Sequence, residues 1–260
     1  MQRVLFHETI FGPIHSRRLG SSLGVNLSPT DGKVCSFDCL YCEAGYNAQG
    51  PGTTGLPRRE EVARLLEAKL QSMKADGTPL DVITFSGNGE PTMHPDFGGI
   101  IDDTIALRDR YFPGVKISVL SNSTRLHRPD VTEALKRVDN NILKLDSAFD
   151  STAALLDRPV DSRYSIADVI ESLRSFDGQV IVQTMITRGE HDGVAIDNST
   201  AREIDALIEA YRTIRPREVM IYTIDRPTPE RSLQRVSREE LDRIAERITA
   251  ETGITVQVSG

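Results

Sequence analysis

Short β-rich segments alternate with amphipathic helical segments along almost the whole chain, and this order limits the folds that it can adopt. The β-rich runs lie at residues 23–27, 80–85, 115–120, 142–145, 179–186, 218–224 and 254–258. Between them, apolar residues recur at the spacing of one helical face, as in Val131, Ala134 and Val138. Similar spacing begins at Ile166, Ile204 and Leu241. Because crossovers between parallel strands are right-handed, this order predicts a parallel sheet with helices outside it.

About six strand-then-helix units and one closing strand fit into the chain, fewer than a full eight-fold barrel requires. The 260 residues are 38% hydrophobic and 27% charged, which is typical of a globular protein, and no long linker divides them. Capping-box spacings mark three expected helix starts: Thr200 with Glu203, Ser237 with Glu240, and Ser165 with Asp168. Gly253 fits a helix end.

Charge and hydropathy exclude some classes of function. The net charge of −7 argues weakly against broad nucleic-acid binding, which usually needs a basic surface, but it leaves room for a local basic groove. No apolar run approaches the roughly 20 residues of a membrane helix. The opening sequence MQRVLFHETIFG lacks the basic start and long apolar stretch of an export signal. We therefore expect a cytoplasmic protein with no membrane partner.

All three cysteines lie close together in a long connection at residues 28–55. Cys35, Cys39 and Cys42 form a C-x3-C-x2-C motif in the run CSFDCLYC. An odd number of clustered cysteines does not suit a disulfide framework and favours metal ligation or reactive thiols in a reducing compartment. In a parallel α/β fold this connection leaves the carboxyl end of its strand, where ligands bind.

Three thiolates on one flexible loop can wrap an iron–sulfur cluster, because short spacers let neighbouring sulfurs reach different irons. Such clusters normally take four protein ligands, so three cysteines leave one iron open. An electron carrier has no use for that position, whereas an enzyme can bind its reactant there. Two alternatives remain: a zinc site completed by His7 or His15, although paired C-x2-C knuckles are missing, and a coincidental thiol-rich loop.

With the aromatic residue Tyr41 before its last cysteine, the motif resembles that of the radical S-adenosylmethionine (radical SAM) superfamily. The family's pattern is C-x3-C-x-aromatic-C after the first strand of a partial, six-unit parallel barrel. The resemblance implies that Cys35, Cys39 and Cys42 hold a [4Fe-4S] cluster. It also implies that the amino and carboxylate groups of S-adenosylmethionine (SAM) chelate the fourth iron.

The resemblance covers about residues 23–225 and sharpens the expected fold. The fold class that it implies is α/β, a partial (βα)6 parallel TIM-like barrel with an extra C-terminal strand. We expect a short N-terminal extension at residues 1–22 and a single radical SAM domain at residues 23–260.

A finer resemblance lies in residues 12–29, GPIHSRRLGSSLGVNLSP, followed by VCSFDCLYCE. This stretch is similar to the wyosine-synthase-like branch of the superfamily, which carries G-P-x-x-S-R-R-L-G-x-S-L-G-V before the cysteines. Wyosine synthases rebuild a guanine base in transfer RNA. Those enzymes carry further cysteines for a second cluster, and this chain has none.

The strand expected at residues 80–85 runs into SGNGEPT. Gly87 and Gly89 let the backbone approach a ligand, and Glu90 can accept hydrogen bonds from an ammonium group. Taken alone, the segment is equally typical of an ordinary strand-to-helix turn. Beside the cysteine motif it resembles the family's Gly-Gly-Glu motif, with Asn88 in place of the second glycine. That likeness implies that residues 87–90 bind SAM through its methionine amino group.

Strand polarity in NILKLDS marks two charged residues. Because the outer face of a helix-wrapped barrel is apolar, Leu143 and Leu145 should face the helices and direct Lys144 and Asp146 inward. Buried charges are costly unless they are paired or used on a ligand. Lys144, the candidate catalytic residue, could form a Schiff base, bind an anionic substrate group, or pair with Asp146 or Glu90.

Polar residues at other strand ends should line the same cavity. Alternation places Asn122 and Tyr222 there with Asp146. In the family such residues bind the ribose or methionine part of SAM, which the resemblance implies for Asn122 and Asp146. Without a ligand, Asn122 could simply lie in a turn, and Asp146 could cap the loop that follows its strand. Tyr222 either contacts adenine or packs against its neighbours.

Three basic residues near the cysteines form a further candidate. Arg17 and Arg18 precede the first expected strand, and Lys33 precedes the first cysteine. Together they could form a positive rim for an anionic substrate or for the SAM carboxylate. Arginines on a protein surface are, however, usually just solvated.

The resemblance implies a radical SAM enzyme of the oxidoreductase or transferase type. An electron from a donor such as flavodoxin or ferredoxin leads to cleavage of SAM into methionine and a 5′-deoxyadenosyl radical, which takes hydrogen from the substrate. With no cysteine left for a thiyl relay, this abstraction should be direct. The substrate would be a nucleobase, as in an RNA, or a small metabolite. Alternatives are an activating enzyme for a glycyl-radical enzyme, which acts on a protein, and a non-catalytic iron–sulfur or zinc module.

Overall fold

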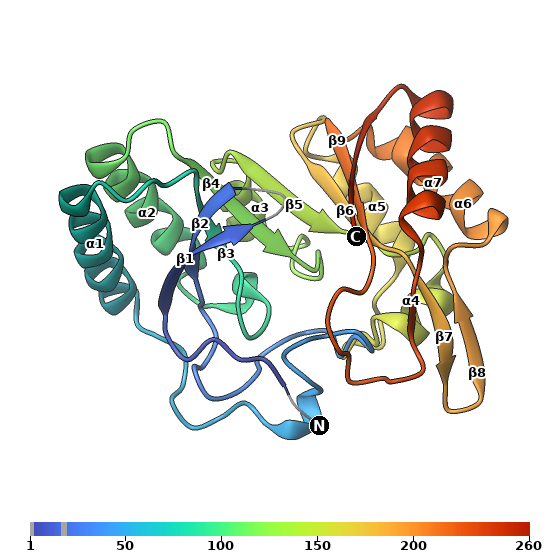
Figure 1. Ribbon diagram of the computed structural model, residues 1–260, viewed down its shortest axis with the longest axis horizontal. Helices are drawn as coiled ribbons and strands as arrows, with labels where there is room; N and C mark the ends of the chain where they lie inside the picture. The colour runs from blue at the N-terminus through green and yellow to red at the C-terminus, as the bar shows by residue number, and fades with distance from the viewer. Residues whose placement is uncertain (1–2, 17–19) are drawn as a thin grey trace.

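One eight-stranded sheet forms the centre of the molecule in the computed structural model, which describes residues 3–16 and 20–260 (Figure 1). Its parallel strands follow one another in chain order: β2 (Gly20–Val25), β3 (Val82–Phe85), β4 (Lys116–Ser121), β5 (Asn140–Lys144), β6 (Ile181–Met185), β9 (Glu218–Tyr222) and β11 (Thr255–Ser259). Every β-rich run expected from the sequence is a strand of this sheet. The stretch before residue 23 adds β1 (Ile10–Ser16), which lies antiparallel to β2 at the sheet edge.

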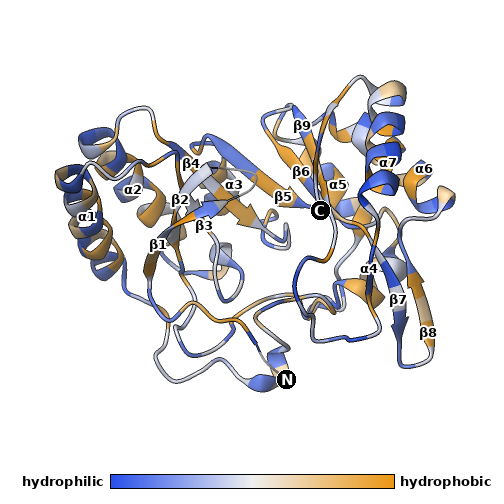
Figure 2. Ribbon diagram, viewed as in Figure 1, coloured by the Kyte–Doolittle hydropathy of each residue, from blue (hydrophilic) through white to orange (hydrophobic). Residues whose placement is uncertain are grey.

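Helices cover the outer face of the sheet. They are α1 (Arg59–Asp76), α2 (Phe97–Tyr111), α3 (Pro129–Leu135), α4 (Asp150–Leu156), α5 (Ile166–Arg174), α6 (Ala201–Ile214) and α7 (Arg238–Thr252). Outward side chains such as Leu23, Val119 and Leu143 share one buried apolar core with the helices, and Figure 2 shows apolar residues on both the strands and the helices. The predicted α/β fold is confirmed. Within the described ranges, no helix combines the length and apolar character of a membrane span.

All three expected helix starts precede a helix, and two of them make the side-chain cap hydrogen bond. Thr200 and Ser237 accept hydrogen bonds from the main-chain nitrogens three residues later. The helix start predicted at Ser165 is also correct, because α5 begins at the next residue, but the Ser165 side chain makes no cap hydrogen bond. Asp150 Oδ1 instead accepts from Ile166 N at 2.7 Å, so a distant carboxylate satisfies the first donor of α5. Gly253 ends α7 in the left-handed conformation, with φ 73°.

A second, three-stranded sheet lies outside the expected pattern. It contains β7 (Thr187–His191), β8 (Val194–Asp197) and β10 (Gln234–Arg235) in the order β10-β7-β8. Asp192 and Gly193 join β7 to β8 with φ values of 49° and 78°. An Asp-Gly pair between two short strands is a strong hairpin signal, so the sequence did contain evidence for this element.

The inner face of the large sheet changes character along the strands. An apolar cluster of Ile142, Ile181 and Met220, with Leu120 packed against it, forms a floor. Lys144 and Gln183 are paired in register on β5 and β6, two residues beyond Ile142 and Ile181. Gln183 Nε2 is buried with no hydrogen-bond partner among the described residues. Polar groups therefore gather at the carboxyl ends of the strands, above the apolar floor.

Candidate functional site

Main-chain contacts hold the cysteine loop, residues 34–42, on two sides. Val34 forms a parallel bridge with Gly89 in the connection after β3. On the other side, Leu40 N donates a hydrogen bond to Leu156 O at 3.0 Å, at the end of α4. Backbone hydrogen bonds to two separate connections therefore fix this long loop, although it contains no regular helix or strand.

The glycine turn, residues 87–90, packs directly on the cysteine loop. A Cβ atom at Gly89 would lie 1.8 Å from Val34 O and 2.7 Å from Ser28 Oγ. Gly87 faces Asn26 in the same way, with 2.2 Å between a Cβ and Asn26 Oδ1. Both positions need glycine because atoms of Asn26, Ser28 and Val34 leave no room for a side chain. The two motifs marked by the sequence form one structural unit.

The three cysteines are free thiols. Cys39 is buried, and Cys35 and Cys42 are partly buried. Burial raises the pKa of Cys35 to about 12, with a further contribution from the nearby Glu90 carboxylate. Burial also raises the pKa of Cys39. The loop therefore presents three reduced sulfurs in a largely dry environment.

Lys33 lies inside the protein beside these sulfurs. It is 3% exposed, and its Nζ donates to Gly45 O at 2.8 Å and lies 3.6 Å from Asp38 Oδ1. Burial alone would lower the pKa of Lys33, but the cysteines and Asp38 raise it. Lys33 thus does not contribute to an exposed positive rim, contrary to the expectation from the sequence. Arg17 and Arg18, the other expected members, lie outside the described residues.

The donor set fits an iron–sulfur cluster with three protein thiolates. The buried Lys33 ammonium offsets the charge of such thiolates, and Asn122 Nδ2 lies 3.6 Å from Cys35 Sγ. His7 and His15, which the zinc alternative requires, are both exposed. In the described part of the chain, no three His, Cys, Asp or Glu side chains are arranged to hold a single metal ion. A four-iron cluster binds each cysteine through a different iron and does not need that convergence.

Glu90 and Asn122 meet beside the cysteine loop. Glu90 Oε2 accepts from Asn122 N at 2.7 Å, and Oε1 accepts from Thr92 Oγ1 at 2.6 Å. Burial raises the pKa of Glu90, and these hydrogen bonds oppose part of that effect. The Asn122 amide also donates to Ser36 Oγ at 3.0 Å. Glu90 and Asn122 thus brace the end of β4 against the loop.

The Asn88 amide bonds three main-chain groups. Its Oδ1 accepts from Phe6 N at 2.8 Å, and its Nδ2 donates to Phe6 O at 2.9 Å and to Pro29 O at 2.8 Å. The side chain is fully buried, and both hydrogens of the amide nitrogen are used. The structure therefore gives the Asn88 side chain, expected to bind cofactor, a structural role.

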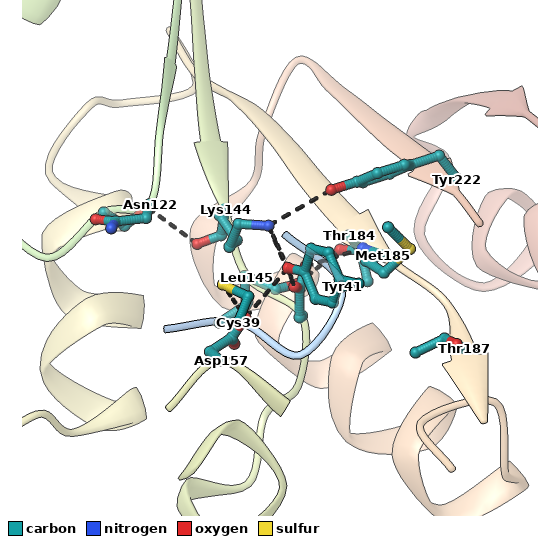
Figure 3. Close-up of polar contacts among 12 residues, drawn as sticks. Cys39, Tyr41, Asn122, Lys144, Leu145, Asp157, Thr184, Met185, Thr187 and Tyr222 are labelled. Carbon is teal, nitrogen blue, oxygen red and sulfur yellow. Dashed lines mark hydrogen bonds and ion pairs between the residues drawn. The ribbon is translucent and has the colours of Figure 1, made fainter. Parts of the chain in front are cut away.

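Lys144, at the end of β5, lies among oxygen atoms of neighbouring side chains (Figure 3). Its Nζ donates to Tyr41 OH, lies 3.3 Å from Asp146 Oδ2, and donates to Tyr222 OH at 3.4 Å. Burial alone would lower the pKa of Lys144, but Asp146 and Tyr222 raise it well above its ordinary value. A Schiff base needs a neutral amine, so the structure favours the ion pair with Asp146 among the expected roles.

Asp157, which the sequence did not mark, completes this buried cluster. It follows α4 and is 1% exposed. Its Oδ1 accepts from Tyr41 OH at 3.2 Å and from Cys39 Sγ at 3.6 Å, while Tyr41 OH also contacts Asp146. Burial and the charge of Asp146 raise the pKa of Asp157 well above its usual range.

A cavity of about 350 Å³ opens beside the cluster. Tyr41 and Tyr222 line it together with Phe6, with His15 of β1 and with Gly260 after β11. Since β1 and β11 are the two edge strands, the cavity joins the two edges of the sheet. Its size falls in the range of small-molecule sites, with aromatic rings and convergent polar groups in its wall.

Comparisons with known proteins agree with this geometry. The model of the Radical SAM superfamily matches residues 30–194. A UPF0026 protein of Helicobacter pylori is 30% identical over 239 residues, which make up 89% of this chain and 71% of that protein.

Two solved structures share the fold. A radical SAM methyltransferase from Sphaerobacter thermophilus superposes with a TM-score of 0.65 and 19% identity, covering 92% of this chain and 65% of that one. TYW1 with a lysine-pyruvate adduct bound gives a TM-score of 0.60 and 16% identity, covering 88% of this chain and 73% of that one. At these identities the likeness establishes the arrangement of strands and helices. In length, this chain covers about two thirds of the methyltransferase.

Proposed function

This chain belongs to the radical SAM superfamily, and we propose that it is an enzyme in which a 5′-deoxyadenosyl radical takes hydrogen directly from a nucleobase or a small metabolite. The superfamily uses a [4Fe-4S] cluster and SAM. The contact between the cysteine loop and the glycine turn carries the proposal. It joins the candidate iron ligands to the candidate SAM site in one unit.

The residues of that unit have separate tasks in the proposal. Cys35, Cys39 and Cys42 would hold the cluster, and Lys33 would offset the negative charge of the thiolates. The glycine turn would receive the methionine part of SAM. Bound cluster and SAM together supply one-electron cleavage of SAM to methionine and the radical.

The buried charged cluster would orient the reactants. Asp146 Oδ1 accepts from Met185 N at 2.9 Å, while Oδ2 faces Lys144 and Tyr41. Asp146 would thus position Lys144 and Tyr41. Lys144 and Tyr222 would hold a polar group of substrate or SAM, and the apolar floor below them would exclude water.

The nucleobase assignment is supported by the motif at residues 12–29 and by the fold shared with TYW1. Unlike the tRNA-modifying enzymes, this chain has no cysteines for a second cluster. For that reason we keep a small metabolite as the alternative to a nucleobase. An electron donor such as flavodoxin or ferredoxin would reduce the cluster. A reducing cytoplasm is the location that we propose, because the cysteines must remain thiols.

Anaerobic reconstitution tests this function. We expect the protein to bind iron and sulfide in equal amounts and, with dithionite and SAM, to release 5′-deoxyadenosine. Cys42→Ala should abolish the release, whereas Ser36→Ala, in the same loop, should retain it. Iron and sulfide without 5′-deoxyadenosine would indicate a non-catalytic module. Release that requires a large partner protein would indicate activation of a glycyl-radical enzyme.

A further inference from the structure

Asn88 is the position at which this chain departs from the Gly-Gly-Glu pattern. A glycine there would make none of the three side-chain hydrogen bonds that Asn88 makes. Two of them join the nitrogen and the oxygen of one residue, Phe6, at 2.8 and 2.9 Å. The amide thus holds Phe6 as a neighbouring strand would, and it is 0% exposed. Without it, three main-chain groups would lose their partner.

The N-terminal segment, residues 3–9, makes main-chain contacts just after the cysteine loop and just after the end of β2. Val4 N donates to Glu43 O at 2.8 Å, directly after the last cysteine. Asn26 N donates to Thr9 O at 2.8 Å, directly after β2. Asn88 holds the middle of the segment. The segment is thus tied to both parts of the candidate cofactor unit.

The ring of Phe6 is part of the wall of the cavity. It lines the cavity that also contains Tyr41 and Tyr222. Its other neighbour is Phe11 of β1, on which it stacks with ring centroids 3.9 Å apart. Since Asn88 holds the main chain of Phe6, the position of this wall depends on the glycine turn.

We propose that Asn88 is a positioning residue that couples the glycine turn to the N-terminal segment, and so places Phe6 in the wall of the reaction cavity. A ligand that orders the turn then orders the segment, and an ordered segment strengthens binding at the turn, because coupling between two sites is reciprocal. The link between Asn88 and the segment stands on its contacts alone. The link to SAM rests on the proposed function.

Hydrogen exchange measured by mass spectrometry tests the first link without cofactor. Asn88→Ala should raise the exchange rate of the amides in residues 4–7 about tenfold or more, because the Phe6 amide loses its acceptor. Asn198→Ala is a matched control. Asn198 is equally buried and bonds three main-chain groups of Asp146, Met185 and Thr187. The Asn198→Ala substitution should destabilise the protein but should not raise the amide exchange rate of residues 4–7.

Equal exchange of residues 4–7 in Asn88→Ala and the wild type would overturn the proposal. If Asn88→Ala does not fold, Asn88→Gly serves in its place, since the turn already accommodates glycine on both sides. Asn88→Asp keeps the acceptor for Phe6 N but loses both donors, so its exchange rate should lie between those of the wild type and Asn88→Ala.

The second link is tested on the reconstituted, reduced holoenzyme by electron paramagnetic resonance. The SAM concentration that half-converts the cluster spectrum should rise several-fold in Asn88→Ala. SAM should also slow exchange of residues 4–7 in the wild type, and less so in Asn88→Ala. An equal SAM response in both proteins would overturn the coupling. A wild type that shows no SAM response at all would overturn the proposed function, while the exchange result without SAM would still stand.

Discussion

The cofactor side and the reactant side of the site are built in different ways. On the cofactor side, the cysteine loop and the glycine turn touch through main-chain atoms, with no room for a side chain at Gly89. On the reactant side, the Tyr41 hydroxyl links Lys144 to Asp157 through side-chain hydrogen bonds.

The two sides therefore constrain the sequence differently: one requires small residues, and the other requires particular ionisable side chains. Main-chain contacts need small residues and fixed loop lengths but are indifferent to most side chains. A buried side-chain cluster needs particular ionisable groups, because each charge requires its partner. We infer that the cofactor side tolerates changes in most side chains, whereas the reactant side does not.

The largest expected effect is steric and falls on the cofactor side. Gly89→Ala places a Cβ where Val34 O would be 1.8 Å away, so the two motifs must separate. We expect a loss of about 4 kcal/mol in the free energy of unfolding, together with poor cluster loading. Urea denaturation and iron analysis measure both effects.

Gly98→Ala is the control for this substitution. Its nearest neighbouring atoms lie 3.9 Å from the position of a Cβ, and the residue is in α2. Alanine should be neutral there or stabilise the helix slightly. Comparable losses at Gly98 and Gly89 would mean that closeness to Val34 is not the cause.

The next effect is electrostatic and falls on the reactant side. Lys144→Met leaves the Asp146 carboxylate buried without its cation, which should cost about 3 kcal/mol of stability. Lys136→Met removes an exposed pair with Glu133 and should cost no more than about 0.5 kcal/mol. Thermal or urea unfolding of both variants makes the comparison. Equal losses would show that Lys144 and Asp146 do not depend on each other.

The smallest effect concerns one hydroxyl group. Tyr222→Phe removes the 3.4 Å hydrogen bond from Lys144 and leaves the ring in place. We expect a stability loss of about 1 kcal/mol or less, because this bond is long. SAM affinity is measured by equilibrium dialysis. A loss of SAM binding free energy larger than the loss of unfolding free energy would place Tyr222 at the cofactor. Unchanged SAM affinity would place it at the substrate.

The sequence was sufficient for the sheet and for the orientation of β5. Alternation in NILKLDS correctly placed Leu143 and Leu145 in the core and Lys144 and Asp146 inside the barrel, since period-two patterns depend only on local geometry. The hairpin of β7 and β8 was missed although its Asp192-Gly193 turn is a local signal.

Long-range contacts explain the other misses. Asp157 reaches Tyr41 across 116 positions of the chain, and no local pattern marks a residue that follows a short helix. No local pattern in the sequence indicates that the Asn88 amide bonds Phe6, 82 positions away. Asp150 replaced Ser165 as the cap of α5 for the same reason. Each of these contacts joins residues that are not neighbours in the sequence.

Mössbauer spectroscopy of protein reconstituted with ⁵⁷Fe tests the central claim most directly, because it resolves the environment of each iron. If three cysteines hold a cluster with one open position beside the glycine turn, SAM should change the signal of a single iron and leave the others as they were. A spectrum without a cubane cluster, or one in which SAM alters none of the irons, would contradict the account.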